Sequence, residues 1–531
     1  MKYLFKNTKI VSTFGPAITR EFNTEQDLNN SGLSDSLAIV EKTIEDLIFS
    51  GINCVRFNFS HGSSEEQLLR VKLINRVQKK LIESQNGNSN KNKFLRPMIL
   101  MADTKGPEIR VYTMEAKEGV TYEIGDVLTI SCIERVVGNK NGFSVLDSTG
   151  RYNMANDCIV GNTILVEDGK LSLEILEVDK AKGLVKAKVR NRHILKANKR
   201  INLPGADYSM DFLSEKDEFD IRLAMDNGFE YVALSFVNSK ENILEVKSLI
   251  EKHSKEKGIK NNMKIISKIE TLKSCENIDD IIEYSDGIMI ARGDLGLEIP
   301  YFQVPYWTKQ IVRKCREKGK PVIVATQMLD SLERSVVATR AEVSDVYRAA
   351  ELGTDCTMLS GETAQGLFPV IAVKTMCDIV YESEKFFNYD RHVGLVKTKG
   401  MSSEVEKICN SLLEVMKNNK DVGSILVSSK DVDPATLEAI SSLRLPAPLF
   451  NFISVDKLDM TCGEPHLSCP VYCGVKDHLS LALNRSINPV LVSGSSSSDL
   501  ISTFQEFRSV FDTDANFSGK VVYFDNGSWK I

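Results

Sequence analysis

Polar and charged side chains recur at the ends of short apolar runs in this sequence, and their types suit the binding of phosphate and cations. One run ends in CVRFNFSHG and carries Arg56, Asn58 and Ser60 at alternate positions. Because side chains alternate between the two faces of a strand, these three lie on one face. A single polar residue there is commonly a structural contact, but three in register, with an arginine among them, favour a functional surface.

Two later runs end in a lysine and two carboxylates. Lys268 and Glu270 share a strand face in ISKIE, and Asp294 follows the next run in IARGDLG. Two carboxylates on adjacent strand ends, with space for water and substrate oxygens, are the usual protein contribution to a Mg²⁺ site. The alternative is an ion pair between Lys268 and a carboxylate that closes the end of the sheet without a metal.

Another strand end supplies oxygen ligands and further positive charge. Asp103 and Thr104 in MADTKGPEIR, together with Asn58 and Ser60, would suit a cation of low charge density such as K⁺. The same oxygens can also hydrogen-bond to one another, so this assignment stays open at the level of sequence. Arg110 closes the segment and adds a second guanidinium.

Two more segments belong to the same rim. VATQM places the hydroxyl of Thr326 at a strand end, and the stretch from Gly293 to Gly296 is typical of a helix start, whose free N–H groups could hold a carboxylate or phosphate. The sequence has no GxxxxGK[ST], HExxH or GxSxG motif, and no GxGxxG after a strand. Any phosphate binding must therefore use strand-end side chains.

Eight apolar runs, each followed by a segment with helical periodicity, supply these strand ends. Near-continuous apolar strands that alternate with amphipathic helices imply a parallel sheet covered by helices. Eight such units favour a closed (β/α)8 barrel, the TIM barrel, whose active site lies at the carboxyl ends of the strands. An open doubly wound sheet is the alternative that counting leaves open. The runs cover residues 8–15, 52–60, 97–103, 231–237, 263–270, 287–294, 321–326 and 356–362.

The pattern changes twice along the chain. Within 111–201 the runs shorten, alternate and are separated by turn residues, which predicts a small β-barrel or sandwich inserted after the third barrel strand, where a lid belongs. After about residue 389 a hydrophilic stretch precedes a C-terminal α/β domain. We expect a barrel domain in two parts (1–110 and 202–388), an inserted β-barrel lid domain (111–201) and a C-terminal α/β domain (389–531). In the last we expect a helix near 403–417 and five strands, at 424–427, 449–453, 470–473, 489–492 and 520–524.

Composition narrows the class of protein. The chain has 531 residues, which exceeds the usual size of one core. A net charge of −5 and the lack of a Lys/Arg block argue against broad nucleic-acid or lipid binding. Eleven cysteines, an odd number without a disulfide pattern, favour reduced thiols, and no run has the features of a signal peptide or a membrane span. We expect a cytoplasmic protein with no nucleic acid or membrane partner.

Seven segments together resemble one enzyme family. They occur in the order RFNFSHG, DTKGPEIR, NLPG, SKIE, ARGDLG, TRAEVSDV and LSGETAQG. With these segments in place, the sequence resembles pyruvate kinases over essentially the whole chain. The resemblance implies transfer of a phosphoryl group from phosphoenolpyruvate to ADP in glycolysis, which gives pyruvate and ATP. It also implies a requirement for Mg²⁺ (or Mn²⁺) and K⁺, and a homotetramer with TRAEVSD near a subunit contact.

The resemblance also implies residue roles. Arg56 and Lys268 would neutralise the phosphoryl group during transfer, with Thr326 near the carbon that is protonated afterwards. The remaining roles concern ligands. Glu270 and Asp294 would hold Mg²⁺; Asn58, Ser60, Asp103 and Thr104 would bind K⁺; Ala291, Arg292 and Gly293 would seat the substrate carboxylate; and Asn58, His61, Arg110 and Lys199 would face the nucleotide. Glu108 matches the potassium-dependent form of the family.

One segment departs from the family pattern. Many relatives bind a sugar-phosphate activator with a Ser/Thr-rich loop after the first C-terminal strand, but this chain has SSKDVDPATLEA there. Asp431 and Asp433 would repel a phosphate, although Ser428, Ser429 and the stretch Ser495–Ser498 could still contribute hydroxyls. We predict weak or no activation by fructose 1,6-bisphosphate.

Two other functions fit parts of the pattern. A barrel enzyme that performs C–C bond chemistry on phosphoenolpyruvate or pyruvate with Mg²⁺ would need neither an ADP lid nor the basic set of Arg56, Arg110 and Lys268. A non-catalytic sensor derived from the enzyme would have lost a residue that handles phosphate, and none is lost here. Metal binding by Cys469, Cys473 and His466 is less favoured than packed thiols.

Overall fold

Eight parallel strands close into a barrel at the centre of the molecule. The computed structural model describes residues 6–85, 93–258, 263–389, 392, 402–455, 476–493, 500–511 and 519–531. Around the barrel the strands follow one another in chain order, and the last pairs with the first. The (β/α)8 prediction is confirmed, and the open doubly wound alternative is wrong. The strands are β1 (Lys9–Thr13), β2 (Cys54–Asn58), β4 (Ile99–Asp103), β14 (Tyr231–Leu234), β15 (Lys264–Ile269), β16 (Gly287–Ala291), β17 (Val322–Ala325) and β18 (Cys356–Leu359).

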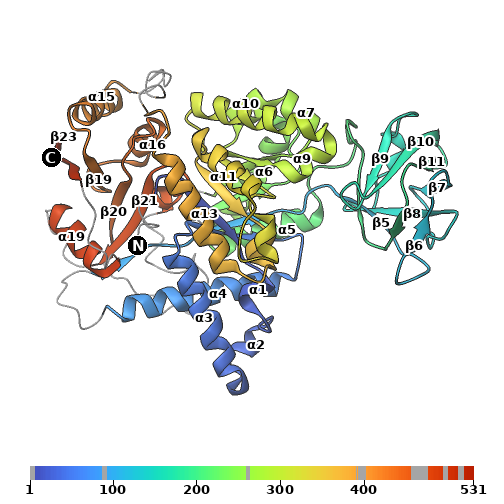
Figure 1. Ribbon diagram of the computed structural model, residues 1–531, viewed down its shortest axis with the longest axis horizontal. Helices are drawn as coiled ribbons and strands as arrows, with labels where there is room; N and C mark the ends of the chain where they lie inside the picture. The colour runs from blue at the N-terminus through green and yellow to red at the C-terminus, as the bar shows by residue number, and fades with distance from the viewer. Residues whose placement is uncertain are drawn as a thin grey trace.

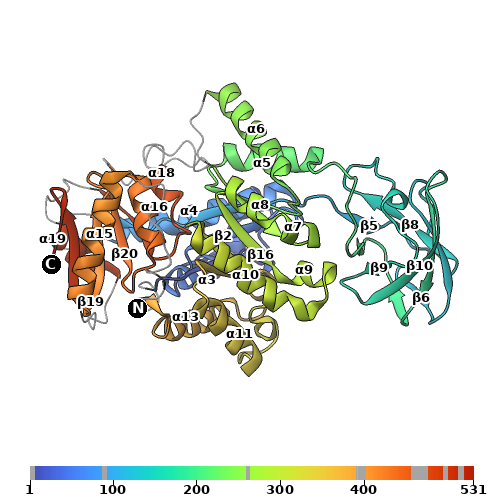
Figure 2. The same ribbon diagram turned by 90° about the horizontal axis from the view of Figure 1, so that it is seen from above.

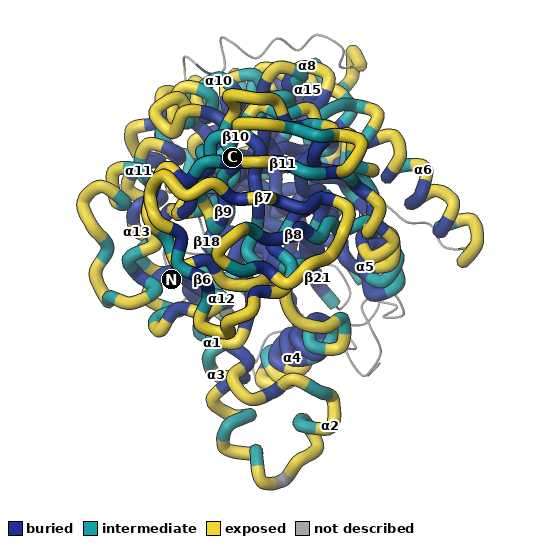
Figure 3. The backbone as a smooth tube through the Cα atoms, turned by 90° about the vertical axis from the view of Figure 1, so that its right-hand side faces the viewer, coloured by how far each residue is buried: buried dark blue, intermediate teal, exposed yellow. Residues whose placement is uncertain are grey.

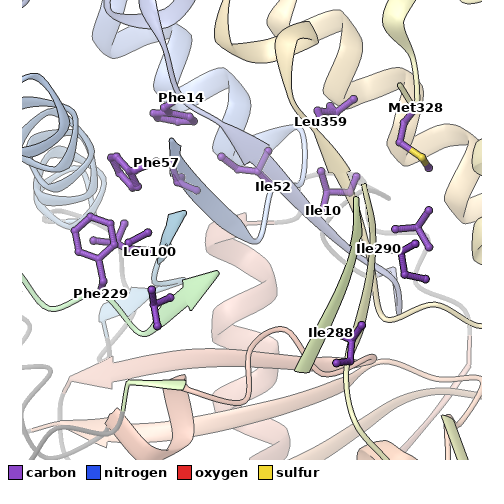
Figure 4. Close-up of a cluster of buried hydrophobic side chains, with 14 of the residues drawn as sticks. Ile10, Phe14, Ile52, Phe57, Leu100, Phe229, Ile288, Ile290, Met328 and Leu359 are labelled. Carbon is purple, nitrogen blue, oxygen red and sulfur yellow. The ribbon is translucent and has the colours of Figure 1, made fainter. Parts of the chain in front are cut away.

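Helices surround the barrel because the outward-facing side chains of its strands are apolar. Ile10, Ile52, Phe57, Leu100 and Ile288 belong to one buried cluster between strands and helices (Figure 4). The helices that follow the strands are α1 (Pro16–Thr19), α2 (Glu25–Leu28), α3 (Ser34–Phe49), α4 (Ser64–Glu83), α5 (Glu215–Asp226), α6 (Lys240–Lys257), α7 (Leu272–Glu276), α8 (Ile278–Tyr284), α9 (Arg292–Glu298), α10 (Val304–Glu317), α11 (Arg340–Glu351), α12 (Gly361–Ala364) and α13 (Pro369–Glu384).

Local sequence sets the ends of the helices as expected. The hydroxyl of Ser63 accepts a hydrogen bond from the backbone N–H of Glu66 at 3.2 Å and caps α4. Gly51, just beyond α3, has φ +104°, a conformation that glycine adopts without strain. These two signals fix where α3 ends and α4 begins, and hence the position of β2 between them.

The inserted segment forms a second closed barrel, which settles the choice between barrel and sandwich. Figures 1 and 2 show it at one end of the molecule, beyond the ends of the central strands. Its core is a separate apolar cluster that includes Ile130, Phe143 and Leu173. In Figure 3 the tube of this segment alternates between buried and exposed residues, as expected for a small barrel. The strands, in barrel order, are β10 (Leu171–Asp179), β11 (Leu184–Val189), β7 (Val127–Ser131), β8 (Gly142–Asp147), β5 (Ile109–Val111), β13 (Arg200–Asn202) and β9 (Thr163–Val166), and β6 (Val120–Tyr122) pairs with β12 (His193–Leu195).

The C-terminal sheet lies at the opposite end of the molecule (Figure 1). Its six described strands are more than the five predicted. One unpredicted strand, β3 (Lys93–Leu95), comes from the chain just before the third barrel strand and pairs antiparallel with β21, and another, β23 (Ser528–Lys530), forms a terminal hairpin. The predicted strand at 470–473 and the stretches containing Cys469, His466 and Ser495–Ser498 lie outside the described residues. The other strands are β19 (Val422–Ser428), β20 (Leu449–Val455), β21 (Ile487–Ser493) and β22 (Lys520–Asp525), with helices α15 (Ser403–Asn418), α16 (Pro434–Ser442), α18 (Lys476–Leu479) and α19 (Leu500–Phe511).

The C-terminal sheet packs against the amino end of the barrel. Inward-facing barrel residues such as Met101 and Ile266 share an apolar cluster with Leu479 and Leu483. Lys9, the first residue of β1, donates to Asn488 at 2.9 Å. This end of the barrel is therefore closed, and the carboxyl ends of the strands remain for a site. Within the part of the chain that the structure describes, no helix is both long and apolar enough to cross a membrane.

Candidate active site

A cleft of about 410 Å³ lies between the carboxyl ends of the central strands and the inserted barrel. It brings together ten of the residues predicted from sequence. They are Arg56, Asn58, Ser60, His61, Asp103, Arg110, Lys199, Lys268, Glu270 and Asp294. The remaining lining residues are Lys105, Glu108, Glu167, Asp168, Lys170, Asn198, Arg200, Ser235 and Phe236.

Asp103 holds two cations in place on the floor of this cleft. Its Oδ2 accepts from Arg56 Nε at 2.6 Å, and its Oδ1 accepts from Lys268 Nζ at 3.1 Å. Arg56 also donates from Nη1 to Thr13 at 3.0 Å, and Lys268 to Ser235 at 2.8 Å. Strand register explains the convergence, because β2 and β4 are neighbours and β14 alone separates β4 from β15.

Burial and the neighbouring charges shift the pKa values of Asp103 and Lys268. Burial alone would raise the pKa of Asp103, but Arg56 and Lys268 outweigh it and lower that pKa below the usual value. Burial also acts to lower the pKa of Lys268, and Asp103 and Glu270 overcome it and raise that pKa. Asp103 is therefore ionised and Lys268 carries its positive charge at neutral pH.

The two carboxylates predicted to bind a metal lie close enough to influence each other. Glu270 accepts from Lys268 Nζ at 2.9 Å and from the backbone N–H of Phe236 at 2.7 Å. Burial raises the pKa of Glu270 to about 6, with Lys268 opposing and Asp294 adding to the rise. Burial would also raise the pKa of Asp294, but Arg200 and Lys268 lower it. The two carboxylates thus offer hard oxygen ligands, and the charge of each one affects the pKa of the other.

This donor set fits a divalent ion only in part. Among the described residues, no group of three or more His, Cys, Asp or Glu side chains could hold a metal ion. Glu270 and Asp294 line one open cleft, so two carboxylates are available, and the other ligands would have to come from water and substrate, as is usual for Mg²⁺. The sequence alternative, an ion pair of Lys268 with a carboxylate, is also present as a contact.

The residues predicted to bind K⁺ are neighbours, but three of them face the cleft and one does not. Asn58 and Asp103 are paired in the register of β2 and β4, and Asn58 Oδ1 accepts from the backbone N–H of Ser60 at 3.1 Å. Thr104 is not among the lining residues; its hydroxyl accepts from the backbone N–H of Ser235 at 3.2 Å. Its carbonyl oxygen accepts from the hydroxyl of Ser235 at 2.7 Å.

The residues predicted to face the nucleotide come from both barrels. Arg110, on β5, donates to both oxygens of Glu108 at 2.9 and 3.2 Å. Lys199, beside β13, pairs with Glu167 at 3.0 Å. His61 follows β2, and burial together with Arg110 lowers its pKa, so it is neutral at physiological pH. The cleft wall opposite the central strands therefore belongs to the inserted barrel.

A third group lies beside the cleft rather than along its wall. Ala291 and Ala325 are paired in register, which brings the residues after them together. The hydroxyl of Thr326 accepts from the backbone N–H of Gly293 at 2.7 Å, so this N–H is not free in the structure. Arg292 donates to Asp345 at 2.7 Å and to the carbonyl of Thr326 at 2.9 Å. Thr326 itself has φ +68°, an unusual conformation for a β-branched residue.

Sequence reasoning missed two residues whose side chains touch the predicted carboxylates and lysine. Ser235 follows β14, so the rule that strand ends carry the site would have found it. Arg200 donates from Nη1 to Asp294 Oδ1 at 2.6 Å. It precedes the NLPG segment and alternates with Asn202 on β13, and that alternation was the available signal.

Comparisons with known proteins agree with one another. A family model described as "Pyruvate kinase, barrel domain" matches residues 5–373. The pyruvate kinase of Mycoplasma pneumoniae is 44% identical over 410 residues, which cover 77% of each chain. That of Bacillus licheniformis is 35% identical over 491 residues, 92% of this chain and 76% of the relative. A crystal structure of a pyruvate kinase from Cryptosporidium parvum has a TM-score of 0.78 and 27% identity, with 99% of this chain and 95% of that chain covered.

Proposed function

Because this chain belongs to the pyruvate kinase family, its reaction is phosphoryl transfer from phosphoenolpyruvate to ADP, and we propose that Arg56 and Lys268 stabilise the group in transfer. The observation that carries this assignment is the shared partner Asp103, which holds both cations at one point of the cleft. Phosphoryl transfer requires positioning and positive charge around a spread negative transition state, and little covalent chemistry from the protein.

Glu270 and Asp294 would hold Mg²⁺ or Mn²⁺ between them. Such an ion supplies neutralisation of phosphate and enolate charge when bound. Both carboxylates line the cleft that contains Arg56 and Lys268, which supports a common site. In the absence of the ion, Lys268 and Arg200 balance their negative charge.

K⁺ would lie next to this site, among Asn58, Ser60, Asp103 and Thr104. The first three line the cleft, and Thr104 would contribute its backbone carbonyl, which here accepts from Ser235. Glu108 fits the same requirement for K⁺. Its carboxylate adds negative charge beside this site, where it pairs with Arg110 and, at 3.7 Å, with Lys105. A monovalent cation there would add positive charge to the transition-state environment.

The substrate carboxylate would be seated by the backbone of Ala291, Arg292 and Gly293, with Thr326 near the carbon that takes up a proton. The bond between Thr326 and the N–H of Gly293 supports their acting as one unit, and it must open for that N–H to meet a carboxylate. Thr326 would orient a water molecule for protonation of the enolate. Its strained backbone is typical of functional positions.

ADP would bind between the two barrels, against Asn58, His61, Arg110 and Lys199. Positive charge from the inserted barrel faces the phosphate-handling cations of the central barrel across the cleft. This arrangement supports a lid role for 111–201, with 1–110 and 202–388 as the two parts of the central domain and 389–531 as the C-terminal domain. Closure of the lid on ADP would exclude water from the phosphoryl group.

The protein would act as a homotetramer in the cytoplasm. Tyr301, Phe302 and Tyr306 are exposed near the start of α10, as are Val336 and Val337 just before α11, the helix that contains most of TRAEVSD. Exposed apolar residues grouped in this way are typical of subunit contacts. The concentration dependence of sedimentation in an analytical ultracentrifuge tests this assembly.

One assay tests the reaction together with its ions. Pyruvate is measured with phosphoenolpyruvate, with and without ADP, and then with Mg²⁺ or K⁺ omitted in turn. We expect pyruvate only with ADP, and large losses when either ion is absent. Phosphoenolpyruvate consumption without ADP would favour C–C bond chemistry instead, and binding without turnover would favour a sensor.

A further inference from the structure

Arg200 reaches from the inserted barrel into the central barrel. It is the first residue of β13, which pairs with β5 and β9 of the inserted barrel. Its Nη1 donates to Asp294 Oδ1 at 2.6 Å, and its guanidinium carbon lies 4.8 Å from the centre of the Phe236 ring. Arg200 is therefore a direct ionic link between the lid and a carboxylate of the candidate metal site.

The guanidinium is held less firmly than its short ion pair suggests. Arginine–carboxylate pairs are frequently bidentate, with two parallel hydrogen bonds. Here Nη1 alone bonds to Asp294, and Nη2 is buried with no acceptor among the described residues. A buried donor without an acceptor costs free energy. Little free energy is therefore lost when Arg200 leaves Asp294 for a position that satisfies more of its N–H groups.

The charges around Arg200 explain why it takes this position without a metal. Asp294, Glu270 and Glu108 are the negative groups with the largest effect on it, and they overcome the effect of burial and raise its pKa. Lys268 Nζ lies 2.9 Å from Glu270 Oε1. Asp294 is thus paired with Arg200, and Glu270 with Lys268. A divalent ion between the two carboxylates would supply both of these positive charges by itself.

We propose that Arg200 is a built-in counter-cation of the divalent site, which must leave Asp294 when the ion binds and thereby couples metal binding to the position of the lid. The inference rests on the proposed role of Glu270 and Asp294. A positive guanidinium 2.6 Å from one ligand oxygen competes with a divalent ion for that oxygen and repels it by charge. The resting site is consequently tuned to bind the ion less tightly than its two carboxylates would by themselves.

The link to the lid follows from the neighbouring residues of β13. Asn202 donates to Glu298 Oε1 at 3.0 Å, and Tyr208 donates to the same carboxyl oxygen at 3.4 Å. Release of Arg200 from Asp294 would leave the bond from Asn202 to Glu298 as a contact of this strand with α9, with Tyr208, six residues beyond Asn202, bonded to the same carboxyl group. The strand would then gain freedom at its Arg200 end while it stays attached at its Asn202 end.

The test is the binding of Mn²⁺ to substrate-free protein, followed by the electron paramagnetic resonance signal of the free ion. Wild type is compared with Arg200→Gln, Arg200→Lys and Asp294→Asn. We expect Arg200→Gln to bind Mn²⁺ on the order of 10-fold more tightly, the equivalent of one lost charge-assisted contact. Arg200→Lys, which keeps the charge on a more flexible chain, should fall between that variant and wild type.

The matched control is Arg192→Gln. Arg192 lies in the same inserted barrel, is exposed, and pairs with Glu123 at 2.9 Å away from the cleft, so it carries the same change in net charge. Its Mn²⁺ affinity should equal that of wild type. Thermal melting of each variant establishes that the binding measurements compare folded proteins.

A second readout follows the lid rather than the ion. Hydrogen exchange of the amides of Arg200 and Ile201 is measured with and without Mn²⁺. Wild type should exchange faster at these amides when Mn²⁺ is bound, whereas Arg200→Gln should exchange fast in both conditions.

The outcomes separate this inference from the metal site on which it rests. Unchanged or weaker Mn²⁺ binding by Arg200→Gln overturns the inference, because weaker binding would mean that Arg200 orients Asp294 for the metal. Unchanged Mn²⁺ binding by Asp294→Asn overturns the metal site itself. Tighter binding in Arg200→Gln together with lost binding in Asp294→Asn supports both.

Discussion

Lys268 Nζ lies 3.1 Å from Asp103 Oδ1, although 165 residues separate them along the chain and strand β14 stands between their strands. The same carboxylate binds Arg56 at 2.6 Å. One buried aspartate therefore sets the positions of the two cations that we propose stabilise the phosphoryl group in transfer. Their separation from bulk water makes each of them effective at stabilising negative charge.

Removal of either cation should slow catalysis without unfolding the protein. We expect Lys268→Ala and Arg56→Ala each to reduce kcat by on the order of 100- to 1000-fold, the loss typical of one preorganised contact. The control is Lys264→Ala, at the other end of the same strand β15. Unchanged turnover in both variants would contradict their assigned roles.

Removal of the shared carboxylate should cost stability as well as activity. Asp103→Asn leaves Arg56 and Lys268 buried without their common counter-charge, and breaking a buried pair in this way costs about 3–5 kcal/mol. Glu270 also contacts Lys268 at 2.9 Å, which places the expected loss near the lower end of the range. Urea unfolding monitored by circular dichroism measures it. A variant as stable as wild type would show that Asp103 is not the main partner of the two cations.

Glu298 should make stability depend on pH in a way that a glutamine does not. Burial raises the pKa of Glu298 to about 7, against an unfolded value near 4.3. The folded protein therefore retains a proton that the unfolded chain loses, and its stability falls as pH rises from about 4.3 to about 7. The difference is on the order of 4 kcal/mol.

Glu298→Gln should abolish that part of the pH dependence. Glutamine keeps an acceptor for Asn202, which donates to this side chain at 3.0 Å. Thermal midpoints at pH 5 and pH 7.5 should therefore differ less in the variant than in wild type. An equal difference in the two proteins would mean that Glu298 is ionised in the folded protein throughout this range.

Exchange of Glu108 for lysine should reduce the response to K⁺. A permanent ammonium would provide the charge that K⁺ supplies, at the expense of the bidentate contact with Arg110. We expect wild-type turnover to fall on the order of 10-fold or more when tetramethylammonium replaces K⁺, a barrier change of about 1.4 kcal/mol. Glu108→Lys should show lower turnover that is equal in both salts. A K⁺ response as large as that of wild type would contradict this role.

Fructose 1,6-bisphosphate should activate the enzyme weakly or not at all. Asp433 caps α16 by accepting from the backbone N–H of Thr436 at 3.0 Å, which helps to lower its pKa and keep it ionised near Ser428 at the end of β19. A fixed negative charge there disfavours a phosphate. The measurement is the half-saturating concentration of phosphoenolpyruvate with and without the sugar. A large decrease on addition of the sugar would overturn the prediction.

The apolar runs and their polar ends determined much of this protein in advance. Period-two alternation placed Arg56, Asn58 and Ser60 on one face, and strand counting favoured the eight-stranded barrel that the structure confirms. The insertion after the third strand was also legible, because its runs are short and separated by turns. Such patterns are local, so a sequence carries them without knowledge of the fold.

Only the tertiary structure decided which charges meet. Arg200 and Asp294 are 94 residues apart, and no local pattern reveals that a guanidinium of the inserted barrel contacts a candidate metal ligand. Strand β3, only three residues long, joins a sheet whose other strands begin more than 300 residues later, because edge pairing depends on where the C-terminal sheet packs. Pairing between distant segments is set by the closure of the barrels and the packing between them. It depends on the whole chain at once, so no local stretch of sequence specifies it.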